Sequence, residues 1–80
     1  MITVSLHYFA ILREQRGATQ EQWTTAALTP AAIYGELRAK YSFTLPVSRI
    51  RAAVNGEFVA SDVVLKGGEE VVFIPPVAGG

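Results

Sequence analysis

The last apolar run of the sequence, residues 70–74, constrains the fold more than any other stretch. Val72 and Ile74 alternate with Val71 and Phe73, so both faces of a strand formed here are apolar. A strand of this kind lies inside a sheet and is covered on both sides. Since one helix covers only one face of a small sheet, we expect a partner protein to cover the other face.

Two prolines and then two glycines follow this strand. Pro75 and Pro76 lack an N–H and have a fixed φ, so they end sheet pairing and stiffen the exit of the chain. Gly79 and Gly80 have no Cβ, which lets another protein's backbone or a nucleotide approach closely. The chain after Pro76 reaches roughly 13 Å at about 3.3 Å per residue. We interpret residues 75–80 as an extended tail whose reactive group is the α-carboxylate of Gly80; a non-reactive chain end is the alternative.

Composition and net charge limit the classes of function that the chain can have. Eighty residues predict one domain, 1–80, and a half-hydrophobic composition predicts more apolar surface than a small core can hide. The formal net charge of zero argues against nucleic acid and against an anionic membrane as partners. With no cysteine and one histidine, the sequence predicts no disulfide, no thiolate chemistry and no metal site. It shows neither an apolar run long enough to span a membrane nor a leader pattern, so we expect a cytoplasmic protein.

The spacing of apolar residues predicts an α+β fold. Thr29 followed by Pro30 marks the start of a main helix over residues 30–41, which carries one apolar stripe. Asn55-Gly56 predicts a two-residue hairpin. The other expected elements are strands at residues 2–8, 22–28, 50–54, 57–59 and 70–74 and a short helix at 9–16 that ends at Gly17. A mixed sheet of four to five strands crossed by one main helix, plus a short helix, is the β-grasp arrangement of ubiquitin.

Outside the tail, no group of side chains predicts an active site. His7 lies on the polar face of the first strand and is expected to be a surface residue. Glu69 and Glu70 are adjacent along a strand, so they point to opposite faces and make a poor acid–base pair. Arg49 and Arg51 share one face of a predicted strand with few aromatic residues nearby. Contact with the acidic rim of a partner and a plain solubilising role are both open for these arginines.

Several motifs, in order along nearly the whole chain, resemble those of a known family. They are Tyr8-Phe9-Ala10-x-Leu12-Arg13-Glu14, Ala53-Val54-Asn55-Gly56-Glu57, Leu65-x-x-Gly68-x-Glu70-Val71 and Ile74-Pro75-Pro76-Val77-x-Gly79-Gly80. Together they resemble the small subunit of molybdopterin synthase, the MoaD family. One departure is Gly67-Gly68-Glu69-Glu70, where the family often has Asp-Gly-Asp-Glu; this variation falls in a turn.

The resemblance implies a ubiquitin-like sulfur carrier that binds no cofactor itself. A partner adenylyltransferase would use ATP to adenylate the carboxylate of Gly80, and a sulfur donor protein would convert it to a thiocarboxylate. The tail would then enter the large catalytic subunit, where sulfur passes to cyclic pyranopterin monophosphate in molybdenum cofactor biosynthesis. Two small subunits flanking a dimer of large subunits would form a heterotetramer.

We expect the surface around the tail to contact the partner. The candidate contact residues are Phe9, Phe73, Pro75, Pro76, Val77 and Ala78, with Gly79 next to the reactive Gly80. The alternative for Phe9 and Phe73 is that both rings pack beneath the short helix. Alternative functions are a sulfur carrier for thiamine or tRNA thiolation and a ubiquitin-like modifier that joins Gly80 to lysines of target proteins.

Overall fold

The computed structural model describes residues 1–76 of the chain. Its elements, in order, are β1 (Ile2–Tyr8), α1 (Ala10–Arg16), β2 (Gln20–Thr25), α2 (Pro30–Tyr41), the 3-10 turn η1 (Val47–Arg49), β3 (Arg51–Val54), β4 (Glu57–Val59) and β5 (Glu70–Ile74). The strands form one sheet in the order β2-β1-β5-β3-β4. None of the helices in this part of the chain is long and apolar enough to cross a membrane.

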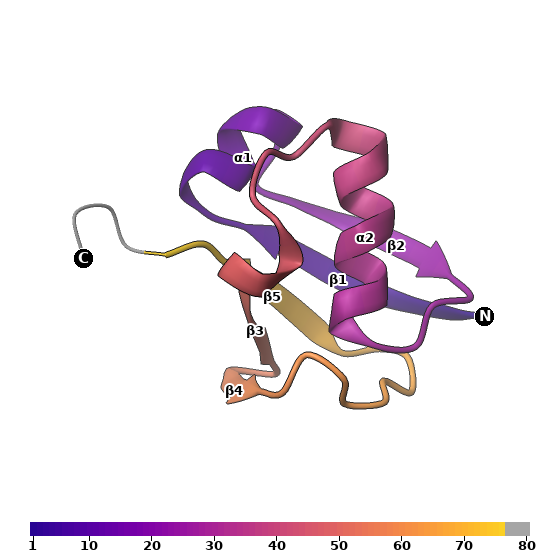
Figure 1. Ribbon diagram of the computed structural model, residues 1–80. Coiled ribbons are helices and arrows are strands. Elements are labelled where there is room, and N and C mark those ends of the chain that lie inside the picture. The colour runs from indigo at the N-terminus through magenta and orange to yellow at the C-terminus, as the bar shows by residue number, and fades with distance from the viewer. Residues whose placement is uncertain (77–80) are drawn as a thin grey trace.

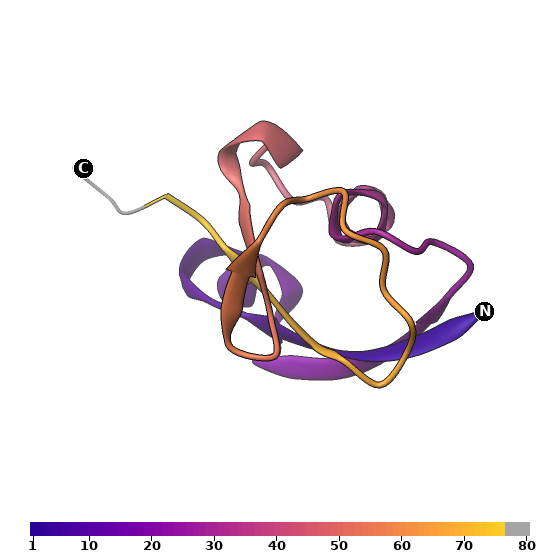
Figure 2. The same cartoon turned by 90° about the horizontal axis from the view of Figure 1, so that it is seen from below.

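The last strand, β5, lies at the centre of the sheet. It runs parallel to β1 on one side and antiparallel to β3 on the other. Helix α2 crosses one face of the sheet, while α1 lies near the end at which β5 leaves it (Figure 1). The view in Figure 2 separates the layers, with the sheet on one side and α2 with the loop that follows it on the other. This is the β-grasp arrangement, so the predicted fold class is confirmed.

Helix α2 has the bounds that the sequence predicts. The Oγ1 atom of Thr29 accepts a hydrogen bond from the N–H of Ala32 at 3.2 Å, and Pro30 occupies the first turn, where no intrahelical partner for an N–H is needed. Ile33, Tyr34 and Leu37 face the sheet and are fully buried. The helix therefore forms because a capped start and an apolar stripe coincide.

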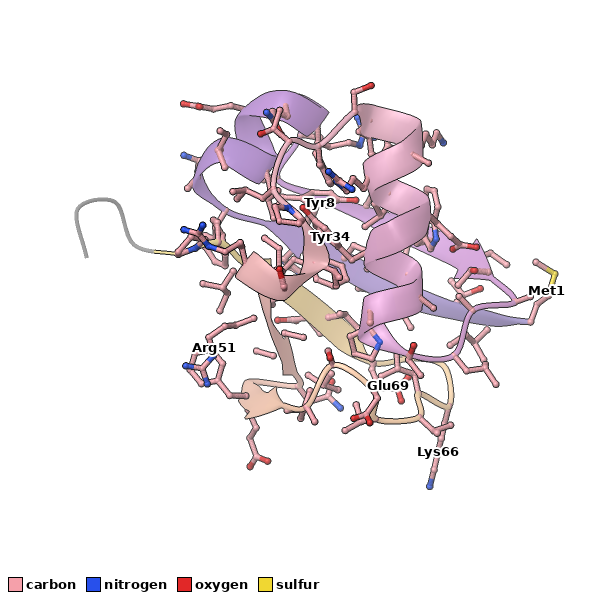
Figure 3. The ribbon with its side chains drawn as sticks, viewed as in Figure 1. Met1, Tyr8, Tyr34, Arg51, Lys66 and Glu69 are labelled. Atoms are coloured by element: carbon pink, nitrogen blue, oxygen red, sulfur yellow. The ribbon has the colours of Figure 1, made fainter. Side chains whose placement is uncertain are left out.

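The core fills the space between α2 and the inner face of the sheet. Val4, Leu6 and Tyr8 of β1 are buried there, as their alternation predicts. Tyr8 and Tyr34 are both found between α2 and the sheet (Figure 3). Strand β5 adds Val71 and Phe73 to the same core.

Phe73 corrects one expectation from the sequence. Its side chain is only 1% exposed, and its ring centroid lies 5.4 Å from that of Tyr34. It therefore packs in the core beneath α2 and not on a partner-facing surface. The alternation itself was correct, because Val71 and Phe73 share the inner face while Val72 and Ile74 are on the outer one, only half-buried. The error was in choosing which of two apolar faces α2 covers.

The predicted bounds are wrong for the second strand, expected at residues 22–28 and found in β2 at Gln20–Thr25. Within residues 1–76 this edge strand pairs with β1 alone, from Ile2 with Thr25 to His7 with Gln20. A polar sequence is compatible with such an edge, so Gln20 and Glu21, which lie outside the predicted strand, pair with β1 as well. At the other end, the Thr25 hydroxyl accepts a hydrogen bond from the N–H of Ala27, which turns the chain away.

The hairpin between β3 and β4 matches its prediction. Asn55 and Gly56 have φ values of 51° and 87°, as a two-residue turn with both central residues in the left-handed region requires. Strand β3 starts at Arg51, and Arg49 belongs to η1. The two arginines therefore do not share one strand face, contrary to the expectation from the sequence.

A carboxylate on β2 joins four elements. Glu21 accepts hydrogen bonds from the hydroxyl of Tyr8 at 2.6 Å, from the hydroxyl of Tyr41 at 3.0 Å and from Nε of Arg16 at 2.8 Å. Burial by itself would raise the pKa of Glu21, but the hydrogen bonds from Arg16, Tyr8 and Tyr41 outweigh it and lower that pKa. Burial and the bond to Glu21 raise the pKa of Tyr8. The carboxylate thus links β1, β2, α1 and α2 while ionised.

Removing this charge should reduce stability in a pH-dependent way. We expect Glu21→Gln to lower the free energy of unfolding at pH 7 by about 1–3 kcal/mol, because charge-assisted hydrogen bonds are lost. The folded pKa of Glu21 is lowered, so its contribution is complete above the unfolded pKa of about 4.3 and disappears as pH falls through the folded pKa. Urea denaturation at pH 7 and at pH 3 measures this, and the gap between wild type and variant should narrow at pH 3. Glu57→Gln, at an exposed carboxylate, is the control; an equal loss there would contradict the prediction.

The position of Phe73 gives a second stability prediction. Phe73→Leu removes part of a fully buried ring, so we expect it to lower the free energy of unfolding by about 1–2 kcal/mol. Phe58→Leu is the matched change at a ring that is 60% exposed, and it should cost less than about 0.5 kcal/mol. The denaturation midpoints of both variants measure the difference. Equal midpoints would show that Phe73 does not lie in the core.

Candidate functional site

The root of the tail, residues 74–76, leaves the sheet from its central strand. Ile74 pairs with Arg51 of β3, and Phe73, just before it, pairs with Tyr8 of β1. Pairing on both edges fixes the direction in which the chain exits. Pro75 is buried and Pro76 is exposed, so the chain passes from the packed structure to the surface between the two prolines. Val77, Ala78, Gly79 and Gly80, which were singled out from the sequence, lie outside the described residues.

An apolar hollow lies beside the tail root, next to α1. It is lined by Phe9, Ala10, Ile11, Glu14, Leu45 and residues 74–76. The side chain of Phe9 is 51% exposed and that of Ile11 is 38% exposed. Two large apolar side chains exposed together beside a projecting chain form a surface that a partner protein can cover.

The start of α1 and the loop after α2 give this hollow its shape. Phe9 is the N-cap of α1 in an extended conformation, and its carbonyl accepts a hydrogen bond from the N–H of Leu12 at 3.1 Å. Ala10 follows with a φ of 51°, a left-handed conformation that is unusual for a residue with a Cβ. The carbonyl of Leu45 accepts a hydrogen bond from the hydroxyl of Tyr34 at 2.7 Å. Leu45 is therefore held beside the tail by a residue of the core.

A cationic hollow lies on the other side of the tail root. It is lined by Ser48, Arg49, Ile50, Arg51, Phe58 and residues 74–76. The guanidinium carbon of Arg51 lies 4.5 Å from the centre of the Phe58 ring, within the range of a cation–π contact. Figure 3 shows Arg51 on the side of the molecule from which the tail departs. One aromatic ring thus lies beside Arg51, and the expectation of few aromatic residues near the two arginines is not contradicted.

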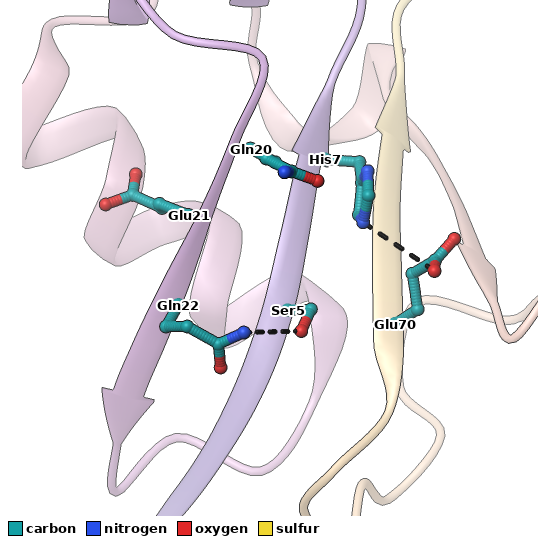
Figure 4. Close-up of a pocket in the computed structure, with 6 residues that line it drawn as sticks. All are labelled: Ser5, His7, Gln20, Glu21, Gln22 and Glu70. Atoms are coloured by element: carbon teal, nitrogen blue, oxygen red, sulfur yellow. Dashed lines mark hydrogen bonds and ion pairs between the residues drawn. The ribbon is translucent and has the colours of Figure 1, made fainter.

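A polar hollow lies on the outer face of the sheet (Figure 4). His7 and Glu70 approach to 3.7 Å, and Nε2 of Gln22 donates a hydrogen bond to Oγ of Ser5 at 2.9 Å. Within residues 1–76, no three His, Cys, Asp or Glu side chains are placed to hold a metal ion. His7 is partly exposed and its nearest charged neighbour is one carboxylate, which fits the expected surface residue.

Strand pairing extends an apolar surface across the outer face of the sheet. Val72 pairs with Ala53, and Ala53 pairs with Phe58, so these three side chains lie on the same face. Ile74 and Arg51 form the next pair on this face, toward the tail root. The uncovered apolar face that the sequence predicts for the last strand is therefore present, and it is continuous with the cationic hollow.

The structure brings together only some of the residues singled out from the sequence. Phe9 and Pro76 are exposed at the tail root, Pro75 lines the floor of both hollows, and Phe73 lies in the core. The lining residues that sequence reasoning missed include Ile11, Leu45 and Phe58. The sequence contained a signal for two of these residues. Ile11 precedes a buried leucine in a short helix and Phe58 follows the hairpin turn, so each is an apolar residue that the predicted core did not account for. Nothing in the sequence placed Leu45.

Comparison with known proteins agrees with this architecture. The family model described as the ThiS family matches residues 6–80. The molybdopterin synthase sulfur carrier subunit of Escherichia coli (strain K12) is 31% identical, over 96% of this chain and 99% of that protein. Small archaeal modifier protein 1 of Haloferax volcanii has the same fold, with a TM-score of 0.79 and 21% identity over 96% of this chain and 100% of that one.

A further structure contains two different subunits. It is the complex of subunits 1 and 2 of the molybdopterin-converting factor from Helicobacter pylori 26695, in which one chain matches with a TM-score of 0.68 and 19% identity over 99% of this chain and 100% of that one. At this identity the likeness establishes the fold alone. The match to the family model and to the curated carrier subunit over nearly the whole chain establishes more, and this chain belongs to the ThiS family of ubiquitin-like sulfur carriers, within which it resembles the MoaD proteins.

Proposed function

We propose that this chain is the sulfur carrier subunit of a molybdopterin synthase. The observation that supports this most directly is the tail root: a central strand leads into Pro75-Pro76 between an apolar and a cationic hollow. The chain is also 31% identical to a curated carrier subunit over nearly its full length. In this function the last residues enter a pocket of the partner while the folded domain remains outside that pocket. Gly80 carries the sulfur, as a thiocarboxylate, to cyclic pyranopterin monophosphate.

The chemistry requires activation of the Gly80 carboxylate. A carboxylate is a poor acyl donor, so an adenylyltransferase joins it to the AMP moiety of ATP and releases pyrophosphate. A sulfur donor then displaces AMP and leaves a thiocarboxylate, whose sulfur is a soft nucleophile that is ionised at neutral pH. Since the chain has no cysteine, its sulfur has to be carried at a group other than a side-chain thiol. Enclosing the tail in a partner limits wasteful hydrolysis.

The partner that receives the tail is a large catalytic subunit. The complex of subunits 1 and 2 of the Helicobacter pylori converting factor supports this choice, because a chain of the same fold occurs there with a second subunit. We assign the catalytic residues to that subunit and assign the tail with its docking surface to this chain. Two chains of each kind would make the heterotetramer that the resemblance implies.

The apolar hollow is the surface that the large subunit covers. Phe9 and Ile11 are exposed there, next to Pro76. Any protein that encloses the tail approaches within the reach of the last four residues, roughly 13 Å. Its surface therefore meets the hollow, and covering two large apolar side chains stabilises the complex.

The carrier function predicts a change in the mass of the chain. After incubation with ATP, its adenylyltransferase and a sulfide source, we expect the intact mass to increase by the difference between one sulfur and one oxygen. A chain that lacks Gly80 should keep its original mass. Mass spectrometry of the intact protein measures both.

Other outcomes of the same experiment are equally informative. An unchanged mass, with an adenylyltransferase shown to be active on another carrier, would overturn the carrier proposal. Isopeptide-linked conjugates with lysines of other proteins, in place of a thiocarboxylate, would identify a protein modifier. A thiocarboxylate that no large subunit accepts, but that supports thiamine or tRNA thiolation, would assign the chain to a different pathway.

The docking surface predicts a loss of affinity on substitution. We expect Ile11→Asp to raise the Kd for the large subunit at least about tenfold, because a charge then replaces an apolar contact at the tail root. The control is Val64→Asp, since Val64 is 70% exposed and lies in the loop before the other end of β5. Isothermal titration calorimetry with the purified large subunit measures both variants. Equal effects at the two positions would show that the apolar hollow is not part of the interface.

A further inference from the structure

The cationic hollow contains an unbalanced charge. The chain has seven basic and seven acidic residues, and its formal net charge is zero. Of the other five basic residues, Arg16 forms an ion pair with Glu21, Arg38 donates to the carbonyl of Phe43, and Lys40 lies over the ring of Trp23. Within residues 1–76, neither Arg49 nor Arg51 forms an ion pair. No acidic side chain lines the hollow.

Arg51 is held in a geometry suited to binding a carboxylate. Its backbone is in β3, paired with Ile74 at the tail root, and its guanidinium packs against the ring of Phe58 at 4.5 Å. Phe58 lies on β4, immediately after the Asn55-Gly56 turn, so the ring that supports the guanidinium is itself fixed by a tight hairpin. An arginine that is already ordered loses less side-chain entropy on binding, and its planar fork matches both oxygens of a carboxylate.

The position of the hollow determines which partner meets it. It shares residues 74–76 with the apolar hollow, so the tail emerges between the two. A protein that takes the tail into a pocket therefore lies against both hollows at once. The apolar hollow presents Phe9 and Ile11, whereas this one presents two cations and one exposed ring.

We propose that Arg49 and Arg51, with the ring of Phe58, bind carboxylates on the rim of the tail-binding pocket in the large catalytic subunit. This inference rests on the proposed function and adds the charge of the partner's rim. Arginine and aromatic side chains at the centre of an interface contribute strongly to affinity, and opposite charges across it determine orientation. Two cations on a neutral chain are too few for a nucleic-acid surface.

The test compares charge reversals at matched exposed positions. Arg51→Glu should raise the Kd for the large subunit about tenfold at low salt, and Arg49→Glu/Arg51→Glu should raise it further. Lys66→Glu is the control, because Lys66 lies in the turn before β5, at the far end of that strand from the tail (Figure 3), and should change the Kd less than about twofold. The difference between Arg51→Glu and wild type should shrink as salt screens the charges.

Two further variants separate charge from geometry and from folding. Arg51→Lys keeps the charge but loses the planar contact with Phe58, so its Kd should lie between those of wild type and Arg51→Glu. Arg51→Gln keeps a polar, extended side chain and should also weaken binding at low salt. Thermal unfolding of each variant, measured alongside, shows whether its β3–β4 hairpin is intact.

The outcomes distinguish this inference from the function on which it rests. One outcome is that Arg51→Glu and Arg51→Gln bind the large subunit as tightly as wild type does at low salt. The inference of an acidic rim on the partner would then be wrong, while the proposed carrier function would be unaffected. If the variants slow adenylation but bind the large subunit normally, the surface belongs to the activating enzyme and the inference fails. If wild type itself does not bind the large subunit, the proposed function fails and the acidic rim fails with it.

Discussion

The pairing of β5 on both of its edges is the constraint on which the rest of this structure depends. Its parallel partner β1 and its antiparallel partner β3 hold the last strand at the centre of the sheet, beneath α2. The chain therefore leaves the fold from its most strongly fixed strand. A segment that continues from such a strand starts at a fixed point, which a segment attached to a loop would lack.

The two faces of β5 lie in different environments. Val71 and Phe73 point into the core, where they contact the side chains of β1 and α2. Val72 and Ile74 point outward, where the pairing of β3 and β4 adds Phe58 to the same face. On the β1–β2 side of the central strand, the ionised carboxylate of Glu21 links β1, β2, α1 and α2 through hydrogen bonds. Of the elements beside the tail root, α1 is thus held in part by a carboxylate that lies outside the root.

The sequence predicted what local rules determine and missed what depends on packing between distant residues. Thr29-Pro30, Asn55-Gly56 and the apolar run of β5 each specify their element locally, and all three predictions were confirmed. The bounds of β2 depend on its register with β1, and the position of Leu45 depends on a hydrogen bond from Tyr34. The mistaken surface position of Phe73 had a similar cause, since only the placement of α2 decides which of two apolar faces is inside.

Under the proposed function, the composition of the tail assigns partner recognition to its root. Gly79 and Gly80 let a partner's backbone approach closely, but a residue without a side chain offers little by which one partner is distinguished from another. A carrier that is charged by one enzyme and discharged by another presents the same last residues to both. Discrimination must then come from side chains within reach of the same pocket mouth, and the nearest are those of the two hollows. One hollow supplies apolar area and the other supplies oriented charge, so a partner that matches both is selected by shape and by electrostatics together.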